Sequence, residues 1–241
     1  MPSFSDLRPF SLEIMPGIFQ ISSQYANAFL IMDKDLTLVD TGFNSSIPLV
    51  LKVMREKGRS IGELKLVVIT HNHLDHVGGL KRLRSLAQFK VAMHRADLTA
   101  DISSLYPRGS IFGSLLRMPF LAPLRKRLTV DKSQIDVVLA GNESFDVLGG
   151  MNVLSTPGHT PGSISLYFPA RKLLIAGDAV GYRGGELQLP RKSVSVDMRL
   201  AAESIRALSK LDIEILCKGH GSPVTRNVPA RLLSLVSSYS R

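Results

Sequence analysis

The sequence predicts an α/β protein in which two β-sheets pack against each other and helices cover their outer faces. Runs of β-forming residues alternate with segments of helical spacing along most of the chain. Many of these runs are apolar at every position, and strands of that kind have to be covered on both faces. With 241 residues, the chain is long enough to bury a large core as one domain.

The first part of the chain combines antiparallel strands with a later alternation of strands and helices. One strand ends in Asp40-Thr41-Gly42, and another runs directly into a histidine-rich segment that begins at His71. The helix between them is closed by Gly58, because glycine is typical of a helix C-terminus. In chain order, we expect strands at 18–21, 28–32 and 36–39, a helix at 47–57, a strand at 65–70, a helix at 79–86 and a strand at 90–94.

The second part of the chain opens with a less regular stretch at about 96–133, after which strands return. Two of the later strands lead into polar turns, at Gly177-Asp178 and at Gly219-His220. We therefore predict a single domain over residues 1–241 with a lid-like insertion at 96–133. In this part we expect strands at 135–139, 143–147, 151–154, 163–168, 172–176 and 213–217, and helices at 199–211 and 229–238.

The composition is that of an ordinary globular protein, with 44% hydrophobic and 21% charged residues. The net charge of +10 comes from basic residues spread over the whole chain, which favours solvated helix faces. A positive field that attracts anionic substrates, nucleic acid or an acidic membrane surface is the alternative. Cys217 is the only cysteine, so no intramolecular disulfide can form. Without a secretory signal or a run of about 20 apolar residues, we expect a cytoplasmic protein with no stable membrane insertion.

The most informative segment holds four residues of metal-binding types within six positions, directly after a strand. They are His71, His73, Asp75 and His76. Side chains two positions apart project to the same side of an extended segment, so His71 and His73 can reach one ion together. Asp75 and His76 then lie on a different edge of the turn and can reach a second ion.

Three further residues complete a two-metal site in the sequence. His159 and His220 each follow an apolar run in a turn flanked by glycine, and Asp178 ends another strand. One zinc ion typically takes three protein ligands and leaves a position for water, so two metals need about six or seven ligands including a bridging carboxylate. We expect two divalent ions with zinc as the first candidate, although iron and manganese suit the same ligands. The prediction assigns His71, His73 and His159 to the first metal, Asp75, His76 and His220 to the second, and Asp178 to the bridge.

These motifs resemble the metallo-β-lactamase superfamily. The resemblance rests on the sequence His71-x-His73-x-Asp75-His76 followed by His159, Asp178 and His220, and it extends to 38–42 and 156–163. It implies an αβ/βα four-layer sandwich, the metallo-β-lactamase fold, with a binuclear site along one edge. The presence of both Asp75 and Asp178 is similar to the glyoxalase II and acyl-homoserine lactonase branches, whereas true β-lactamases lack the bridging aspartate.

The resemblance implies a binuclear metal-dependent hydrolase in which a bridging hydroxide attacks the carbonyl of a small ester, thioester or lactone. Asp75 and Asp178 are the candidate catalytic carboxylates, and either Asp75 or a metal-bound water protonates the leaving group. The alternative is a phosphodiesterase or nuclease of the same superfamily, for which two metals and a positive net charge are also appropriate. A metal-binding protein without catalysis is a third interpretation, but seven ligands around an open site argue against it.

Asp40 and Tyr182 are expected beside the metals. A metal-bound histidine usually donates its other N–H to a carboxylate or carbonyl, and Asp40 is the candidate acceptor. The alternative for Asp40 is a turn aspartate that bonds nearby backbone amides. Tyr182 follows Asp178 by four residues, and in the lactonase branch a tyrosine near the bridging aspartate orients the substrate carbonyl; packing on Pro190 is the alternative. His94 lies outside the motif, where we expect a packing or surface histidine.

The segment 105–127 is rich in large apolar residues interleaved with arginine and lysine. In the family this insertion overhangs the metal site, so it is the candidate lid over a small-molecule substrate with an apolar acyl group and an anionic group. The alternatives are packing on the sandwich, a contact in a homodimer and a membrane-facing surface. We expect no nucleic-acid partner, because the long insertions of the nuclease branches are missing from this sequence.

Overall fold

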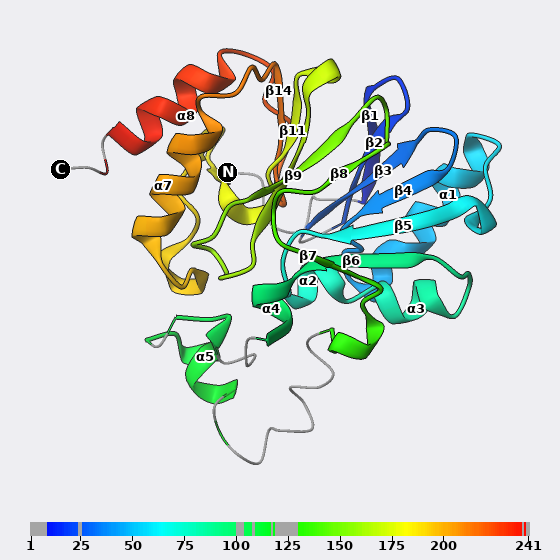
Figure 1. Cartoon of the computed structure of the whole chain (residues 1–241), viewed down its shortest axis with the longest axis horizontal. Helices are drawn as coiled ribbons and strands as arrows, with labels where there is room; N and C mark the ends of the chain where they lie inside the picture. The colour runs from blue at the N-terminus through cyan, green and yellow to red at the C-terminus, as the bar shows by residue number, and fades with distance from the viewer. Residues whose placement is uncertain are drawn as a thin grey trace.

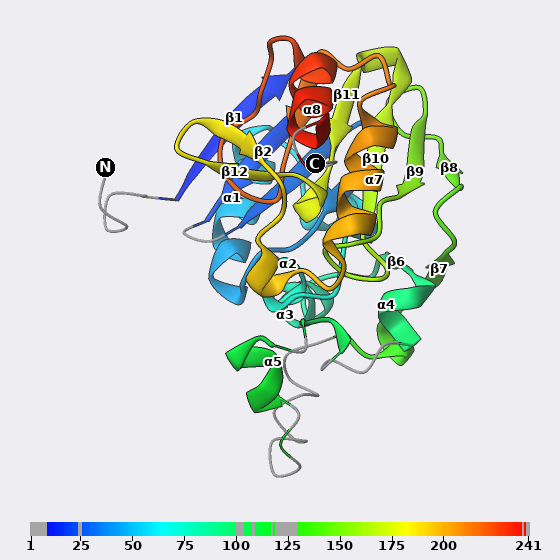
Figure 2. The same ribbon diagram turned by 90° about the vertical axis from the view of Figure 1, so that its left-hand side faces the viewer.

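Two large sheets stack face to face in this protein, and helices cover the outer side of each (Figure 1). The view turned by 90° shows α7 (Met198–Leu208) and α8 (Val228–Ser237) lying across the second sheet (Figure 2). The layers therefore follow the order helix, sheet, sheet, helix, and the predicted α/β class and αβ/βα four-layer sandwich are confirmed. The structure is a computed structural model that describes residues 9–23, 26–99, 104–107, 109–116, 118, 130–237 and 239.

The first sheet has seven strands whose order in space follows the chain. Strands β1 to β4 pair antiparallel, whereas β4 to β7 pair parallel. Parallel neighbours end at the same edge of a sheet, so the residues that follow β4 and β5 meet there. The strands are β1 (Phe10–Met15), β2 (Ile18–Ser22), β3 (Asn27–Met32), β4 (Leu36–Val39), β5 (Leu64–Ile69), β6 (Lys90–His94) and β7 (Val137–Leu139).

The second sheet has five strands in the order β14, β11, β10, β9, β8. Its neighbours pair antiparallel except for β11 and β14, which run parallel. The carboxyl ends of β11 and β14 therefore face the same edge, and a hairpin of β12 and β13 follows β11. The strands are β8 (Ser144–Phe145), β9 (Met151–Ser155), β10 (Ile164–Phe168), β11 (Leu173–Ile175), β12 (Gly181–Arg183), β13 (Glu186–Gln188) and β14 (Ile215–Cys217).

Apolar side chains fill the space between the sheets and the space under the outer helices. Phe29 and Val68 of the first sheet pack with Leu166 and Ile175 of the second. Each such side chain contributes about 1.5–3 kcal/mol when it is fully buried. Helices α1 and α3 cover the first sheet, whereas α7 and α8 cover the second. The helices are α1 (Ile47–Glu56), α2 (Leu74–Val77), α3 (Leu80–Arg84), α4 (Arg95–Thr99), α5 (Ile111–Leu116), α7 (Met198–Leu208) and α8 (Val228–Ser237).

Short 3₁₀ turns connect several of these elements. One of them, η8, follows β11 and carries Asp178. It therefore places this residue at the edge where β11 and β14 end. The turns are η2 (Asn44–Ser46), η3 (Ile61–Glu63), η6 (Lys132–Gln134), η7 (Pro169–Arg171), η8 (Gly177–Ala179) and η9 (Lys192–Val194).

Several elements of the structure differ from the sequence prediction. Strand β1 was not predicted, because it lies at an open edge of the sheet with Phe10 42% and Leu12 44% exposed. The histidine-rich segment, predicted as a turn, contains the short helix α2. The β12–β13 hairpin was also not predicted; its turn at Gly184-Gly185 has positive φ angles of 60° and 88°, which glycine adopts without strain.

The predicted insertion at 96–133 contains α5 and all but the first residue of α4, in a stretch that the sequence predicted to be less regular. Among the described residues, no helix is long and apolar enough to cross a membrane. Part of the predicted lid lies outside the described residues, namely 100–103, 108, 117 and 119–129, and with it the lid residues Arg108, Arg117, Phe120, Leu121, Arg125, Lys126 and Arg127.

Candidate metal centre

The predicted ligands lie where strands of both sheets end. His71 follows β5 of the first sheet, whereas His159, Asp178 and His220 follow β9, β11 and β14 of the second. The site therefore spans one edge of the sandwich. All seven predicted ligands come together in three overlapping groups, within each of which the ligand atoms lie within 4.8 Å of one another. The groups are the first triad of His71, His73 and His159, the second triad of Asp75, His76 and His220, and a connecting group of His71, His76 and Asp178.

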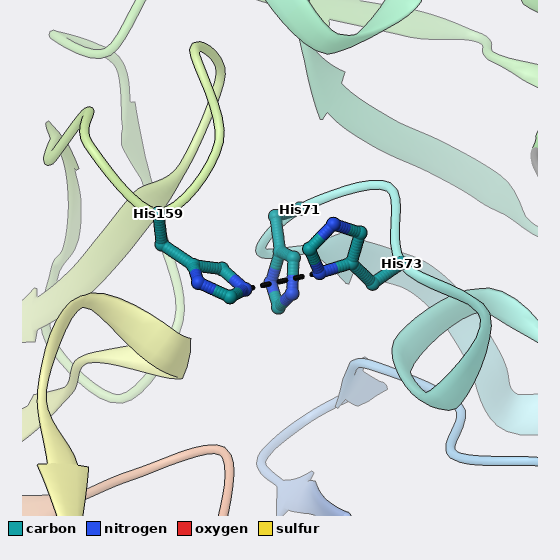
Figure 3. A group of neighbouring side chains, drawn as sticks. All are labelled: His71, His73 and His159. Atoms are coloured by element: carbon teal, nitrogen blue, oxygen red, sulfur yellow. Dashed lines mark hydrogen bonds between the residues drawn. The ribbon is translucent and has the colours of Figure 1, made fainter. Parts of the chain in front are cut away.

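The first triad is buried on all sides. The exposed fraction is 0% for His71, 5% for His73 and 2% for His159. Figure 3 shows the three rings pointing toward one another, with His71 and His73 on one segment and His159 on another. His159 Nε2 lies 3.0 Å from His73 Nδ1. The three ring nitrogens that face inward are therefore close enough to share one ion.

Hydrogen bonds on the outer side of the first triad determine which ring nitrogens carry protons. His73 donates its Nε2–H to the carbonyl of Leu105 at 3.0 Å. Ser195 Oγ donates to the carbonyl of Arg191, so it accepts the Nδ1–H of His159 at 3.1 Å. Both inward nitrogens then carry lone pairs. Two lone pairs 3.0 Å apart repel each other unless a cation lies between them.

His71 completes this arrangement through Thr70 and Asp40. Thr70 Oγ1 donates to Asp40 Oδ2 at 2.7 Å, so it accepts the Nδ1–H of His71 at 3.1 Å. This leaves a lone pair on His71 Nε2, which is buried and has no hydrogen-bond partner among the described residues. Such an orphaned acceptor is costly in a protein interior, and a bound cation would satisfy it.

Asp40 also holds a histidine of the second triad. Its Oδ2 accepts the Nδ1–H of His76 at 2.7 Å, and its Oδ1 accepts the backbone N–H of Thr70 at 2.8 Å. His76 Nε2, on the inner side of the ring, is buried without a hydrogen-bond partner in the described part of the chain. Asp40 has a φ of 57°, in the left-handed region that aspartate tolerates in turns. Its side chain therefore accepts from a candidate ligand and from the end of β5, and within the described residues no bond from it to the backbone amides that follow it in the turn is found.

The second triad is more open to solvent than the first. The side chain of Asp75 is 28% exposed and that of His220 is 41% exposed, whereas His76 is buried. Asp75 Oδ2 lies 3.7 Å from His76 Nε2 and 3.6 Å from His220 Nε2. Helix α2 begins after His73 and carries both Asp75 and His76, and the ring of His76 lies 4.1 Å from that of His71, centroid to centroid.

Asp178 lies between the two triads. Its Oδ2 is 3.1 Å from His220 Nε2 and 3.5 Å from His159 Nε2, and its Oδ1 is 3.5 Å from His76 Nε2. Oδ1 is buried, and no hydrogen-bond partner for it is found within the described ranges. The carboxylate therefore faces histidines of both triads. A Cβ atom at Gly219 would overlap Asp178 Oδ1 and lie 2.8 Å from His76 Cε1, so only glycine fits at this position.

The two triads differ in their ionisation. Burial, followed by the charges of neighbouring groups, lowers the pKa of His159 to about 3 and holds the pKa of His71 well below its usual range. Burial also acts on His76, but the carboxylates of Asp40, Asp75 and Asp178 outweigh it and raise the pKa of His76 to about 10. The first triad thus consists of neutral imidazoles, whereas the second lies in a negative field that favours a cation.

A family model described as the metallo-beta-lactamase superfamily matches residues 24–220. The chain belongs to this superfamily. Among its relatives is a probable metallo-hydrolase of Bacillus subtilis, YflN, which is 28% identical over 257 residues, with 100% of this chain and 97% of YflN covered. A hydroxyacylglutathione hydrolase of Cereibacter sphaeroides is 28% identical over 173 residues, with 71% of this chain and 52% of that protein covered.

A solved structure of a metallo-beta-lactamase family protein from Thermus thermophilus has a similar fold, with a TM-score of 0.71 and 22% identity over 95% of this chain and 81% of that chain. The likeness confirms the metallo-β-lactamase fold. The family match and the metallo-hydrolase relative confirm the prediction of a metal-dependent hydrolase at this general level.

A buried carboxylate behind the ligands of this superfamily member was not predicted from the sequence. Asp97, 1% exposed, accepts the backbone N–H of Asn72 at 2.9 Å, the hydroxyl of Thr160 at 2.8 Å and the backbone N–H of Gly162 at 2.6 Å. It therefore ties the His71 segment to the His159 turn. A Cβ atom at Gly162 would lie 2.6–2.7 Å from Asp97 atoms, which explains that glycine. No local pattern marks Asp97, because its partners are distant in sequence.

The start of the insertion covers the first triad. Leu105 is fully buried and supplies the carbonyl that accepts from His73. The ring of Tyr106 stacks on the ring of His73, with centroids 4.5 Å apart and an interplanar angle of 17°. Burial, together with the charge of Asp75, raises the pKa of Tyr106 above its ordinary value, so the phenol stays protonated. Nothing in the sequence distinguishes Tyr106 from an ordinary aromatic of an irregular stretch.

Tyr182 and His94 lie in different surroundings. The ring of Tyr182 is close to the position that a Cβ atom at Gly221 would take, and the Lys218 ammonium lies 4.2 Å from its centroid. Tyr182 is thus next to the turn that carries His220, and it also packs against the core under α7 and α8. His94 is 6% exposed, and its Nδ1 accepts the backbone N–H of Ala96, which is the behaviour of a packing residue.

Proposed function

We propose that this protein is a binuclear metal-dependent hydrolase that cleaves a small ester, thioester or lactone. In this proposal the first triad holds one divalent ion, the second triad holds the other, and Asp178 bridges them. The observation that carries it is the position of Asp178, whose two oxygens lie 3.1–3.5 Å from the inner nitrogens of His76, His159 and His220.

The chemistry of the donor set supports two ions. Each of the four histidines His71, His73, His76 and His159 has one ring nitrogen bonded to a protein acceptor and the other directed inward. Imidazoles arranged in this way are ligands for zinc when the inner nitrogen carries no proton, and with carboxylates they also suit iron or manganese. We propose zinc as the first candidate on that basis.

The residues divide the work of hydrolysis among them. Two divalent ions in this site would lower the pKa of a water from about 15.7 toward about 7 and polarise a substrate carbonyl. Asp178 faces both triads and orients the groups between them. Asp75 lies at the open side, with Oδ2 within 3.7 Å of His76 Nε2 and His220 Nε2. It is therefore placed to take up the proton of the attacking water and return it to the leaving group.

Exposure indicates the side from which a substrate approaches. Leu105 and Tyr106 cover the first triad, whereas Asp75 and His220 of the second triad are accessible. A substrate carbonyl therefore reaches the site over Asp75 and His220, beside the hairpin that carries Tyr182. We propose that the Tyr182 hydroxyl orients this carbonyl.

Three features support an ester, thioester or lactone substrate over a β-lactam or a phosphodiester. Asp75 and Asp178 together are similar to the glyoxalase II and lactonase branches, and one relative is a hydroxyacylglutathione hydrolase. The described part of the insertion exposes Ile111 by 90%, Leu115 by 44% and Met118 by 42%, which suits an apolar acyl group. We propose that this insertion acts as the lid of the single domain.

A substrate panel tests the reaction class. The zinc-loaded protein is assayed with p-nitrophenyl esters, acyl thioesters, acyl lactones and bis-p-nitrophenyl phosphate. We expect kcat/KM for at least one carbonyl substrate to exceed that for the phosphodiester by about 100-fold or more, on the order of 3 kcal/mol in barrier height. Faster cleavage of the phosphodiester would instead favour the phosphodiesterase or nuclease alternative.

Elemental analysis tests the binuclear site itself. The purified protein is dialysed against metal-free buffer after loading with zinc, iron or manganese. We expect close to two equivalents of metal per chain, because two triads and a shared carboxylate are present. One tight equivalent would contradict the binuclear proposal.

A further inference from the structure

Among the candidate ligands, His220 has the side chain that is least fixed by neighbouring residues. Its side chain is 41% exposed, more than that of any other candidate ligand. The other four histidines have their outer N–H groups bonded to Thr70, Leu105, Asp40 and Ser195. Among the described residues, no hydrogen bond is found on the outer nitrogen of His220. Its position must therefore be determined by the backbone turn that carries it.

A single residue of the opposite sheet binds that turn at three points. Asn27, at the start of β3, donates its backbone N–H to the carbonyl of Gly219 at 2.7 Å. Its side-chain Nδ2 donates to the carbonyl of Lys218 at 2.9 Å and to the carbonyl of Gly221 at 2.8 Å. The carbonyls on both sides of His220 are thus bonded to one side chain, which is itself 2% exposed.

Two neighbours fix the orientation of this amide. Gln20 Nε2 donates to Ser22 Oγ at 2.8 Å and to the carbonyl of Gly221 at 3.1 Å. Ser22 Oγ then donates to Asn27 Oδ1 at 2.7 Å. With Oδ1 occupied as an acceptor, the two N–H bonds of Nδ2 are directed at the His220 turn. Gln20 and Ser22 are also buried, so water does not compete for these bonds.

The position of the 218–221 turn matters because there is no free space between it and the proposed bridging residue, Asp178. A Cβ atom added at Gly219 would overlap Asp178 Oδ1 and lie 2.8 Å from His76 Cε1. If the turn moves toward Asp178, its backbone clashes with that side chain. If it moves away, His220 Nε2 loses its 3.1 Å contact with Asp178 Oδ2. Asn27 belongs to the first sheet and the turn to the second, so this contact sets a distance across the sandwich.

We propose that Asn27 is a positioning residue that holds His220 at the second metal, acting through the backbone of the 218–221 turn. Gln20 and Ser22 assist by orienting its amide. This inference rests on the proposed binuclear function. It predicts a selective effect, because the first triad receives no hydrogen bond from Asn27: loss of the amide weakens the second ion and spares the first.

The test uses the full chain with its metal removed by a chelator and then titrated with zinc against a competing chromophoric chelator. Asn27→Leu keeps the size and neutrality of the side chain but removes both donors. We expect the second stepwise affinity to fall about 10- to 100-fold, the usual cost of losing support behind a metal ligand, and the first to change less than about threefold. Excess zinc should restore kcat. Asn152→Leu, a half-buried strand position away from the turn, is the matched control.

Ser22→Ala provides a milder variant in case Asn27→Leu fails to fold. It leaves the Asn27 donors in place but frees the amide to turn, so the second affinity should fall by a smaller factor. If the unaltered protein binds two ions and the folded variants bind the second as tightly, the role of Asn27 is wrong although the binuclear site stands. If the unaltered protein binds only one ion, the proposed function fails first.

Discussion

The two triads of the candidate metal centre use similar residues but are built differently. The first triad is closed: its three histidines are at most 5% exposed, and the insertion covers it through Leu105 and Tyr106. The second triad is open, with His220 41% and Asp75 28% exposed. The first therefore consists of neutral ligands held by packing, whereas the second combines carboxylates, solvent access and a turn held by backbone contacts.

This difference suggests a division of labour within one site. A closed set of neutral imidazoles suits a permanently held ion, because its ligands need no proton loss and cannot move easily. An open set with a carboxylate at the rim leaves room for water and substrate beside the second ion. Changes confined to one triad, or to the residue that the two share, should therefore have separable effects.

The largest effect is expected from removing the residue that the two triads share. Asp178→Ala deletes the oxygens that face His76, His159 and His220. We expect metal content to fall below two equivalents and kcat/KM to drop by about 1,000-fold or more, since metal-assisted stabilisation contributes several kcal/mol. Asp146→Ala, at an exposed loop position, is the control. Full turnover in the Asp178 variant would rule out its bridging role.

Gly219→Ala should damage the second triad with little direct effect on the first. The added methyl group would overlap Asp178 Oδ1 and press on the His76 ring. We expect a loss of the second equivalent of metal and a decrease of about 100-fold in kcat/KM, measured by elemental analysis and steady-state kinetics. At Gly62 the nearest atom to an added Cβ would be 3.7 Å away, so Gly62→Ala serves as the control. Retention of both metals would show that the turn can shift to accommodate a side chain.

Ser195→Ala should act on the first triad alone. The hydroxyl accepts the Nδ1–H of His159, and without it the ring loses its fixed orientation. We expect the first stepwise metal affinity to fall about 10- to 100-fold, with the second less affected. Ser237→Ala, on an exposed helix position, is the matched control. An equal loss at both steps would mean that the triads are not independent.

The smallest expected effect is the pH dependence of metal affinity, which reports the protons released when each ion binds. His159 has a pKa of about 3 and is already neutral at about pH 7.5, so an ion in the first triad displaces no proton from it. His76 has a pKa of about 10 and is protonated at the same pH, so an ion in the second triad must displace that proton. We expect the second affinity to rise by at least about tenfold per pH unit between about pH 6.5 and 9, and the first to stay nearly constant.

Titration calorimetry in buffers of different ionisation enthalpy measures this difference directly. At least one proton should be released with the second equivalent of metal, because the pKa of His220 is raised by Asp178 as well, and close to none with the first. Equal release at both steps would contradict the assigned ionisation of the two triads.

The ligands could be identified from the sequence because their signals are local. His71, His73, Asp75 and His76 lie within six positions, and a run of apolar residues shows that a strand delivers them. Strands that are apolar at every position also indicate that two sheets stack, because such strands have to be covered on both faces. Exposed elements such as β1 escaped prediction, because an edge strand lacks a continuous apolar pattern. The helical turn α2 escaped as well, since four residues are too short to show a period.

The residues that support the ligands could not be identified in this way. Asp97 reaches Thr160 across 63 residues of chain, and Asn27 reaches Gly221 across 194. Neither separation leaves any trace in local spacing. Asp40 is the exception, because its place at the end of a strand next to β5 could be inferred from the order of elements.

The sequence by itself determined which residues are candidates for the metal and at which strand ends they lie, because strand periodicity and ligand type are properties of neighbouring residues. The tertiary structure alone decided that one triad is closed and the other open, that Asp178 faces both, and that Asn27 holds the turn of His220. Those features arise where two sheets meet at one edge. Burial, lone-pair direction and the space left at Gly219 depend on atoms that only the packed sandwich brings together.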